Sequence, residues 1–121
     1  MQKKILVVDD SATVRQAVRI PLEKTDYLCI EAVDGRDALA RLAAESVDLI
    51  ITDINMPNLD GFGFIREARK LAGARFTPII ILTTESSEEM KKQGKAAGAS
   101  GWIVKPFQAD QLLKVIRLLV K

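Results

Sequence analysis

Short apolar runs and amphipathic stretches alternate along this chain, and their alternation limits the folds open to it. The apolar runs are rich in Ile and Val, as expected of parallel strands buried on both faces. They are Ile5–Val8, Leu28–Val33, Val47–Thr52, Pro78–Leu82 and Trp102–Val104. The amphipathic stretches, which predict helices, are Ala12–Lys24, Gly35–Ala44, Gly61–Leu71, Glu88–Ala97 and Ala109–Val120. Successive strand–helix units of this kind predict a doubly wound α/β fold around a five-stranded parallel sheet.

Residues that favour helix ends flank two of the predicted helices. Asp60 is expected to cap the third helix, and Ser86 or Ser87 the fourth. Gly94 weakens the fourth helix, and the helix is expected to end at Gly98.

Pro21 conflicts with the helix predicted around it. A proline inside a helix lacks an N–H donor and crowds the carbonyl group one turn earlier, here that of Ala17. We therefore expect the first helix either to kink or to end early, near Arg19 or Ile20.

The length and composition fit one soluble domain. The chain has 121 residues, 48% hydrophobic and 28% charged, so we expect a single domain over residues 1–121. Its apolar runs are far shorter than the roughly 18 to 20 residues that cross a bilayer, and the N-terminus does not resemble a signal peptide. A cytoplasmic location follows. Because the chain starts with Met and carries no tag, we expect it to be complete.

Residue counts exclude several kinds of chemistry. The single cysteine, Cys29, rules out an internal disulfide or thiolate metal site, and its apolar surroundings predict a buried, inert thiol. The absence of histidine excludes a histidine phosphocarrier, a Ser-His-Asp hydrolase and the usual zinc enzymes. The net charge of +2 comes from dispersed Lys and Arg, which argues against nucleic-acid binding. Carboxylates, hydroxyls and lysine remain for any reaction.

Polar residues stand where the predicted strands end. Asp9 and Asp10 follow the first strand, Asp53 the third, Thr83 the fourth and Lys105 the fifth. Ligands of open parallel sheets bind at the carboxyl ends of the strands, next to the point where the strand order reverses. With the strand order 2-1-3-4-5, the first and third strands flank this point, so the carboxylates would converge there.

Each of these residues also has an ordinary explanation on its own. Asp10 could cap a helix, Asp53 could belong to a turn, and Lys105 could be solvated. Three converging carboxylates, however, repel one another unless cations compensate, and one lysine is not enough. Magnesium fits the remainder, because it binds few carboxylates and keeps coordination positions for water and phosphate oxygens.

The motifs around these residues resemble the response-regulator receiver family. They are Val7-Val8-Asp9-Asp10-Ser11, Thr52-Asp53-Ile54-Asn55-Met56-Pro57, Asp60-Gly61, Thr83 and Lys105-Pro106-Phe107. The match covers the whole chain, in order and at family spacing. It implies a stand-alone receiver of the CheY type, with the flavodoxin-like (βα)5 fold as a three-layer sandwich.

The resemblance implies a role for each of these residues. Asp53 would accept a phosphoryl group from the phosphohistidine of a partner histidine kinase, with Mg2+ as the cofactor. Asp9, Asp10, Asp53 and the backbone carbonyl of Asn55 would hold the metal. Thr83 and Lys105 would stabilise the phosphoryl group. The resemblance also implies a cis peptide bond between Lys105 and Pro106, which would aim the lysine into the pocket.

Three residues are implied to act in switching and signal lifetime. Trp102 occupies the place of the family's switch aromatic, more often Tyr or Phe, and would turn inward after Thr83 moves; alternatively it simply packs against the fourth helix. Asn55 and Glu85 would flank the path of an attacking water, as in short-lived chemotaxis regulators, or are loop residues without kinetic effect. The face made by the fourth helix, fifth strand and fifth helix would carry the output.

The family leaves rival functions open. The chain would signal in chemotaxis by binding a flagellar motor switch protein, with a phosphatase as a further partner, or act as a phosphate sink or adaptor. It would catalyse only its own phosphorylation and dephosphorylation, as a monomer that binds neither nucleic acid nor membrane. An FMN carrier is disfavoured because Asp9 and Asp10 would repel the phosphate. A dehalogenase-type phosphatase is disfavoured because Ser11 stands where its second Asp is expected.

Overall fold

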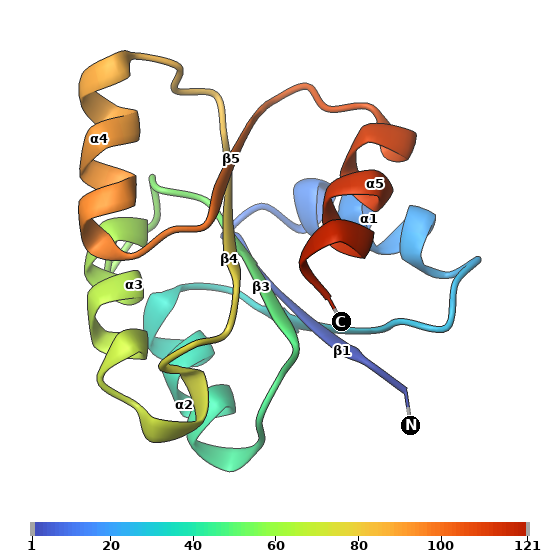
Figure 1. Ribbon diagram of the computed structural model, residues 1–121, viewed down its shortest axis with the longest axis horizontal. Helices are drawn as coiled ribbons and strands as arrows, with labels where there is room; N and C mark the ends of the chain where they lie inside the picture. The colour runs from blue at the N-terminus through green and yellow to red at the C-terminus, as the bar shows by residue number, and fades with distance from the viewer. Residues whose placement is uncertain (1, 121) are drawn as a thin grey trace.

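A parallel sheet of five strands runs through the middle of the molecule, with helices on both faces (Figure 1). The computed structural model describes residues 2–120, so the outermost residues of the expected domain, Met1 and Lys121, lie outside the described residues. The strands are β1 (Lys4–Val8), β2 (Leu28–Ala32), β3 (Leu49–Thr52), β4 (Ile79–Thr83) and β5 (Gly101–Val104). The helices are α1 (Ala12–Leu22), α2 (Gly35–Ala44), α3 (Gly61–Arg69), α4 (Glu88–Ala97) and α5 (Ala109–Leu119), with a 3-10 turn η1 (Ala72–Ala74).

The strand order is β2-β1-β3-β4-β5, which confirms the predicted fold class and topology. All the pairings are parallel, and Val8 of β1 lies opposite both Ala32 of β2 and Thr52 of β3. After β1 the chain adds β2 on one side of it, and β3, β4 and β5 then follow in turn on the other side. The order reverses between β1 and β3, where the ends of the two strands are neighbours.

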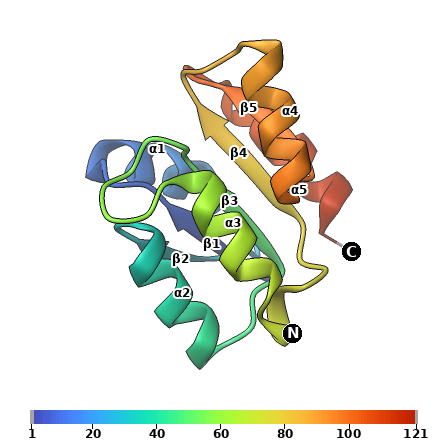
Figure 2. The same cartoon turned by 90° about the vertical axis from the view of Figure 1, so that its left-hand side faces the viewer.

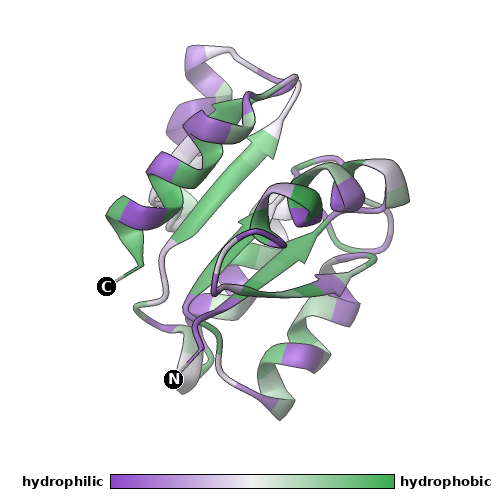
Figure 3. Cartoon of the chain, turned by 90° about the vertical axis from the view of Figure 1, so that its right-hand side faces the viewer, coloured by the Kyte–Doolittle hydropathy of each residue, from purple (hydrophilic) through white to green (hydrophobic). Residues whose placement is uncertain are grey.

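The two faces of the sheet bury separate hydrophobic clusters. Helices α2, α3 and α4 cover one face and α1 and α5 the other (Figures 1 and 2). Side chains alternate between the faces along each strand, so Leu6 and Val8 belong to the first cluster and Ile5 and Val7 to the second. The strands are almost uniformly hydrophobic, whereas the helices carry hydrophilic residues as well (Figure 3).

Most helix ends follow the local rules. Asp60 caps α3 by accepting a hydrogen bond from the Gly63 N–H, and Ser87, rather than Ser86, caps α4. Gly98 ends α4 in the left-handed conformation, with φ 117°. The predicted bounds of strands and helices lie within two residues of the observed ones.

The predicted early end of α1 is wrong. The helix continues past Arg19 and Ile20 to Leu22, with Pro21 inside it. Because Pro21 is next to the last helical residue, it removes one hydrogen bond of the final turn and leaves the earlier ones intact. The N–H of Glu23 donates to the carbonyl oxygens of Arg19 and Ile20, and the buried side chain of Leu22 anchors the end of the helix.

Two further observations concern membrane crossing and the reactivity of the single cysteine. Within residues 2–120, no helix combines the length and the apolar character needed to cross a membrane. Cys29 is half-buried in β2, and burial raises the pKa of its thiol to about 11, which keeps it protonated and unreactive at neutral pH.

Candidate functional site

Three carboxylates converge where β1 and β3 end. One oxygen each from Asp9, Asp10 and Asp53 lies within 4.8 Å of the others. Asp9 and Asp53 are buried, at 3% and 9% exposure, whereas Asp10 faces solvent. The sheet topology places these side chains together, because β1 and β3 are neighbours and end at the same edge.

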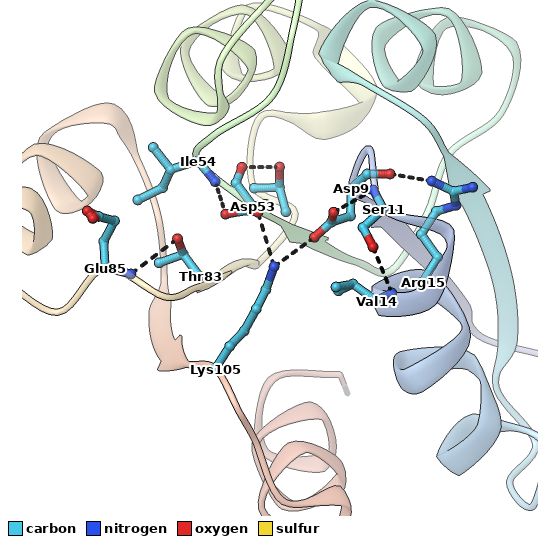
Figure 4. A network of polar contacts seen from close by, with 10 residues as sticks. Asp9, Ser11, Val14, Arg15, Asp53, Ile54, Thr83, Glu85 and Lys105 are labelled. Atoms are coloured by element: carbon cyan, nitrogen blue, oxygen red, sulfur yellow. Dashed lines mark hydrogen bonds and ion pairs between the residues drawn. The ribbon is translucent and has the colours of Figure 1, made fainter.

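Both oxygens of Asp53 are held by hydrogen bonds. The Ile54 N–H donates to Oδ1 at 2.6 Å, and the Lys105 ammonium donates to Oδ2 at 3.1 Å (Figure 4). The chain then returns over the site, where the Gly61 N–H donates to the Ile54 carbonyl. A Cβ on Gly61 would lie 2.2 Å from the Asp53 carbonyl oxygen, so only glycine allows this close approach.

Lys105 joins the two buried carboxylates. Its Nζ lies 3.1 Å from Asp9 Oδ2 and 3.1 Å from Asp53 Oδ2. Burial by itself lowers the pKa of Lys105, but the hydrogen bonds and charges of Asp9 and Asp53 outweigh it and raise the pKa above the usual value. The peptide bond between Lys105 and Pro106 is cis.

Asp9 has a different electrostatic environment from a surface aspartate. Burial raises its pKa, and the hydrogen bonds from the Ser11 N–H and from Lys105 offset that rise only in part. The charged form of Asp9 is therefore costly where it is buried, and a cation bound beside it would favour that form. The helix-cap explanation for Asp10 does not hold, because Ser11 caps α1 by accepting a hydrogen bond from the Val14 N–H.

A chain of hydrogen bonds connects Thr83 to Trp102. Thr83 is fully buried, and its Oγ1 accepts a hydrogen bond of 3.4 Å from the Glu85 N–H. The carbonyl oxygen of Glu85 in turn accepts a 2.9 Å hydrogen bond from the indole Nε1 of Trp102. The indole ring packs against Gly94 of α4, where a Cβ would lie 2.9 Å from its Cζ3 atom.

Asn55 lies beside the carboxylates, on the side that faces α4. Its side chain is exposed and lines a hollow of about 560 Å³ together with Met56, Met90 and Gln93. Glu85 is on the β4–α4 loop and is half-buried. Asn55 therefore lines this hollow, and Glu85 belongs to a different loop whose residues do not line it.

The donor atoms at this edge suit a hard divalent cation. Three carboxylates with one neighbouring ammonium leave uncompensated negative charge, and all the available ligand atoms are oxygens. Magnesium binds one or two carboxylates and keeps waters that phosphate oxygens can replace. Within the described residues, the side chains therefore fit Mg2+ and offer neither the thiolates nor the imidazoles that zinc prefers.

Two contributors to the site were not predicted from the sequence. Ser11 caps α1 and holds Asp9 through its N–H at 2.9 Å, and the Arg15 side chain donates to the Asp9 carbonyl oxygen. A Ser directly before an amphipathic stretch is a recognisable cap signal. No local pattern would have indicated Arg15, because its contact depends on how α1 packs against the sheet.

The model of the response regulator receiver domain matches residues 5–117 of the chain. The fold, the site at the carboxyl ends of β1 and β3 and this match agree with one another. The chain belongs to the response regulator receiver domain family, whose members serve in two-component signalling.

Proteins similar to this chain include a chemotaxis protein, a transcriptional regulator and the receiver domain of a histidine kinase. The chemotaxis protein CheY4 of Vibrio cholerae is 45% identical, with a TM-score of 0.95 over 99% of this chain and 100% of that one. The transcriptional regulatory protein ResD of Bacillus subtilis is 38% identical over 99% of this chain, which spans about half (49%) of ResD. The receiver domain of the Pseudomonas aeruginosa sensor histidine kinase PA1611, solved with a magnesium ion in its active-site cleft, is 26% identical, with a TM-score of 0.90 and 98% of each chain covered.

Proposed function

We propose that the chain is the phosphoacceptor of a two-component system and that Asp53 takes the phosphoryl group. The contact between Asp53 and Lys105 carries this proposal, because it places a buried carboxylate and a cation side by side at the carboxyl ends of the strands. Phosphoryl transfer depends mainly on positioning and charge neutralisation, and these side chains provide both.

In the proposed reaction, an Asp53 oxygen attacks the phosphorus of a phosphohistidine on a partner histidine kinase. A new O–P bond forms and the P–N bond breaks, and its electron pair remains on the imidazole nitrogen, which then takes up a proton. The donor must come from another protein, since this chain contains no histidine. The Ile54 N–H holds Oδ1 of Asp53 and thereby orients Oδ2 toward the pocket.

The other side chains would serve the transferring group. Mg2+, held by Asp9, Asp10, Asp53 and the Asn55 backbone carbonyl, would neutralise negative charge on the phosphoryl oxygens. Lys105 would move its ammonium from the carboxylates to a phosphoryl oxygen. The Thr83 hydroxyl accepts one hydrogen bond and can also donate a hydrogen bond to the phosphoryl group.

Mass measurement after incubation with acetyl phosphate and Mg2+ tests the acceptor. The native protein is expected to gain one phosphoryl group and Asp53→Asn none. Asp60→Asn is the matched control, because it removes a carboxylate from the same β3–α3 loop outside the site and should leave the gain intact. A gain in the Asp53→Asn variant would rule out Asp53 as the sole acceptor.

For the switch, we propose that phosphorylation changes the link from Thr83 through Glu85 to Trp102. If Thr83 moves toward the phosphoryl group, its hydrogen bond from the Glu85 N–H is lost or draws the Glu85 backbone with it, and the Glu85 carbonyl that accepts from Trp102 would then shift as well. Beryllofluoride with Mg2+ is therefore expected to change the fluorescence of Trp102 in the native protein but not in Asp53→Asn. Unchanged native fluorescence would favour a Trp102 that only packs against α4.

For the output, the likeness to CheY4 supports a role in chemotaxis, with phosphorylation-dependent binding to a flagellar motor switch protein by a cytoplasmic monomer. Binding of such a protein only in the presence of beryllofluoride would support this role. Absence of binding in both states would favour a phosphate sink or an adaptor in another phosphorelay.

A further inference from the structure

Arg15 connects α1 to the strand end that carries the carboxylates. Its Nη1 donates to the main-chain carbonyl oxygen of Asp9 (Figure 4). Its Nε donates to Oε1 of Glu31 at 3.0 Å. The Arg15 side chain is only 13% exposed, and Glu31 is further held by Arg19 at 2.9 Å. The guanidinium is thus fixed between β2 and the β1–α1 turn.

With this contact, the polar groups of Asp9 are held from four directions. Its N–H donates to the Ala32 carbonyl of β2, and its carbonyl oxygen accepts from Arg15. Its Oδ1 accepts from the Ser11 N–H, and its Oδ2 accepts from Lys105. Ala32, Arg15, Ser11 and Lys105 come from four separate parts of the fold.

The Arg15 contact also determines the direction in which Asp10 is presented. The peptide group between Asp9 and Asp10 is planar, so a hydrogen bond to the Asp9 carbonyl oxygen fixes the plane that contains the Asp10 nitrogen and Cα. Asp10 is exposed and belongs to the carboxylate cluster. Its approach to the cluster therefore depends on its backbone, which Arg15 holds.

We propose that Arg15, braced by Glu31, is a positioning residue for the magnesium site and sets the orientation of the Asp9–Asp10 peptide. The inference rests on the proposed function, in which these two carboxylates hold Mg2+. Magnesium requires near-ideal octahedral geometry, so ligands that point in the wrong direction bind it poorly. Residues that orient metal ligands typically change metal affinity about 10- to 100-fold when they are replaced.

Positioning and simple electrostatics predict opposite effects of replacing Arg15. Removal of a positive charge near three carboxylates would by itself tighten the binding of a cation. Loss of the carbonyl contact would instead weaken it. Arg19 is a matched control, because it lies one turn further along α1 and pairs with the same Glu31, but its hydrogen bonds do not include the Asp9 carbonyl.

Titration calorimetry of MgCl2 into the full chain separates these possibilities. We expect Arg15→Ala to bind Mg2+ about tenfold more weakly than the native protein and Arg19→Ala to bind it equally or more tightly. Circular dichroism in EDTA establishes that each variant is folded at the temperature used. Native-like or tighter binding by folded Arg15→Ala would overturn the inference.

A second variant covers the case in which Arg15→Ala does not fold. Arg15→Lys keeps the charge and most of the side chain, but a single ammonium cannot reproduce the guanidinium bridge between Glu31 and the Asp9 carbonyl. Its Mg2+ affinity is expected to fall several-fold, and an unchanged affinity would contradict positioning. If the native protein itself does not bind Mg2+, the proposed function fails, whereas equal binding by native protein and Arg15 variants refutes only the role of Arg15.

Discussion

The contact between Gly94 and Trp102 predicts that Gly94→Ala will destabilise the protein, although alanine is the better helix former. The new Cβ would lie 2.8 Å from Cδ1 of Ile81 and 2.9 Å from Cζ3 of Trp102. Favourable contacts between carbon atoms require about 3.5–4.0 Å. Ile81 is fully buried in β4, so its Cδ1 has little room to shift, and the half-buried indole is the group expected to move furthest. Its displacement would break the hydrogen bond from Nε1 to the Glu85 carbonyl.

The size of the effect follows from three contributions. Alanine in place of glycine inside a helix contributes about 1 kcal/mol of stability. Overpacking costs about 2 kcal/mol, and loss of the indole hydrogen bond about 1 kcal/mol. The expected net loss is about 2 kcal/mol. With an unfolding entropy of about 2.1 cal/mol/K per residue, this loss lowers the melting temperature of a domain of this length by roughly 8 °C.

Urea unfolding followed by circular dichroism measures this loss, and Trp102 fluorescence reports the displacement of the indole. Gly73→Ala is the matched control, because nothing lies within 4 Å of a Cβ at that position. It should leave stability unchanged or raise it by up to about 1 kcal/mol. In the Trp102→Ala background, Gly94→Ala should cost at least about 1 kcal/mol less than in the native protein.

The result that would refute this reasoning is a Gly94→Ala variant as stable as the native protein with unchanged Trp102 fluorescence. Equal costs of Gly94→Ala with and without Trp102 would assign the strain to Ile81 alone. In that case α4, rather than the indole, yields to the added methyl group.

Three further predictions concern the site and a hydrogen-bond network at the opposite end of the strands. Asp9→Asn is expected to raise the free energy of unfolding without a divalent cation by about 1–3 kcal/mol, because the buried carboxylate is costly in the folded state. Because the folded pKa of Asp9 is raised, the stability that Asp9 contributes is fully present below its unfolded pKa and is lost as the pH rises through the folded pKa. The stability gained by Asp9→Asn must therefore be larger near pH 7 than near pH 4. Chemical denaturation at both pH values measures this gain, and a larger gain near pH 4 would contradict the prediction. Arg69→Met should lower the free energy of unfolding, measured with urea, by about 3 kcal/mol, because the Arg69 guanidinium donates to four main-chain carbonyl groups. Arg66→Met, at an exposed position, is the control, and an equal loss in both variants would show that these hydrogen bonds do not stabilise the fold. Asn55→Ala and Glu85→Ala should each change the rate of phosphoryl loss, followed by mass measurement, and changes of less than about twofold would leave them without a kinetic role.

Most of the fold could be predicted from the sequence because strand and helix patterns are local. The alternation of apolar runs with amphipathic stretches gave five strands and five helices, and the rule for parallel sheets placed the pocket at their carboxyl ends. Two local features were missed. Pro21 is tolerated because it lies next to the end of α1, and the η1 turn over Ala72–Ala74 has no hydrophobic period of its own.

The site could be predicted in part, and contacts made by long side chains, in the site and elsewhere, were less predictable. Asp9, Asp10 and Asp53 stand directly at strand ends, so the topology alone brings them together. Arg15 and Arg69 act across several elements, and a sequence pattern does not reveal where a flexible guanidinium ends. The hydrogen bond from Trp102 to Glu85 likewise depends on the space that Gly94 leaves on α4.

The bridge from Lys105 to Asp9 joins residues separated by 96 positions in the chain. A contact between such distant residues closes a long loop, which costs more conformational entropy than a local contact. Because synthesis proceeds from the N-terminus, Asp9 and Asp53 are made before Lys105, the lysine that pairs with them. The pocket is completed only when β5 has joined the sheet and brought Lys105 to Asp9 and Asp53.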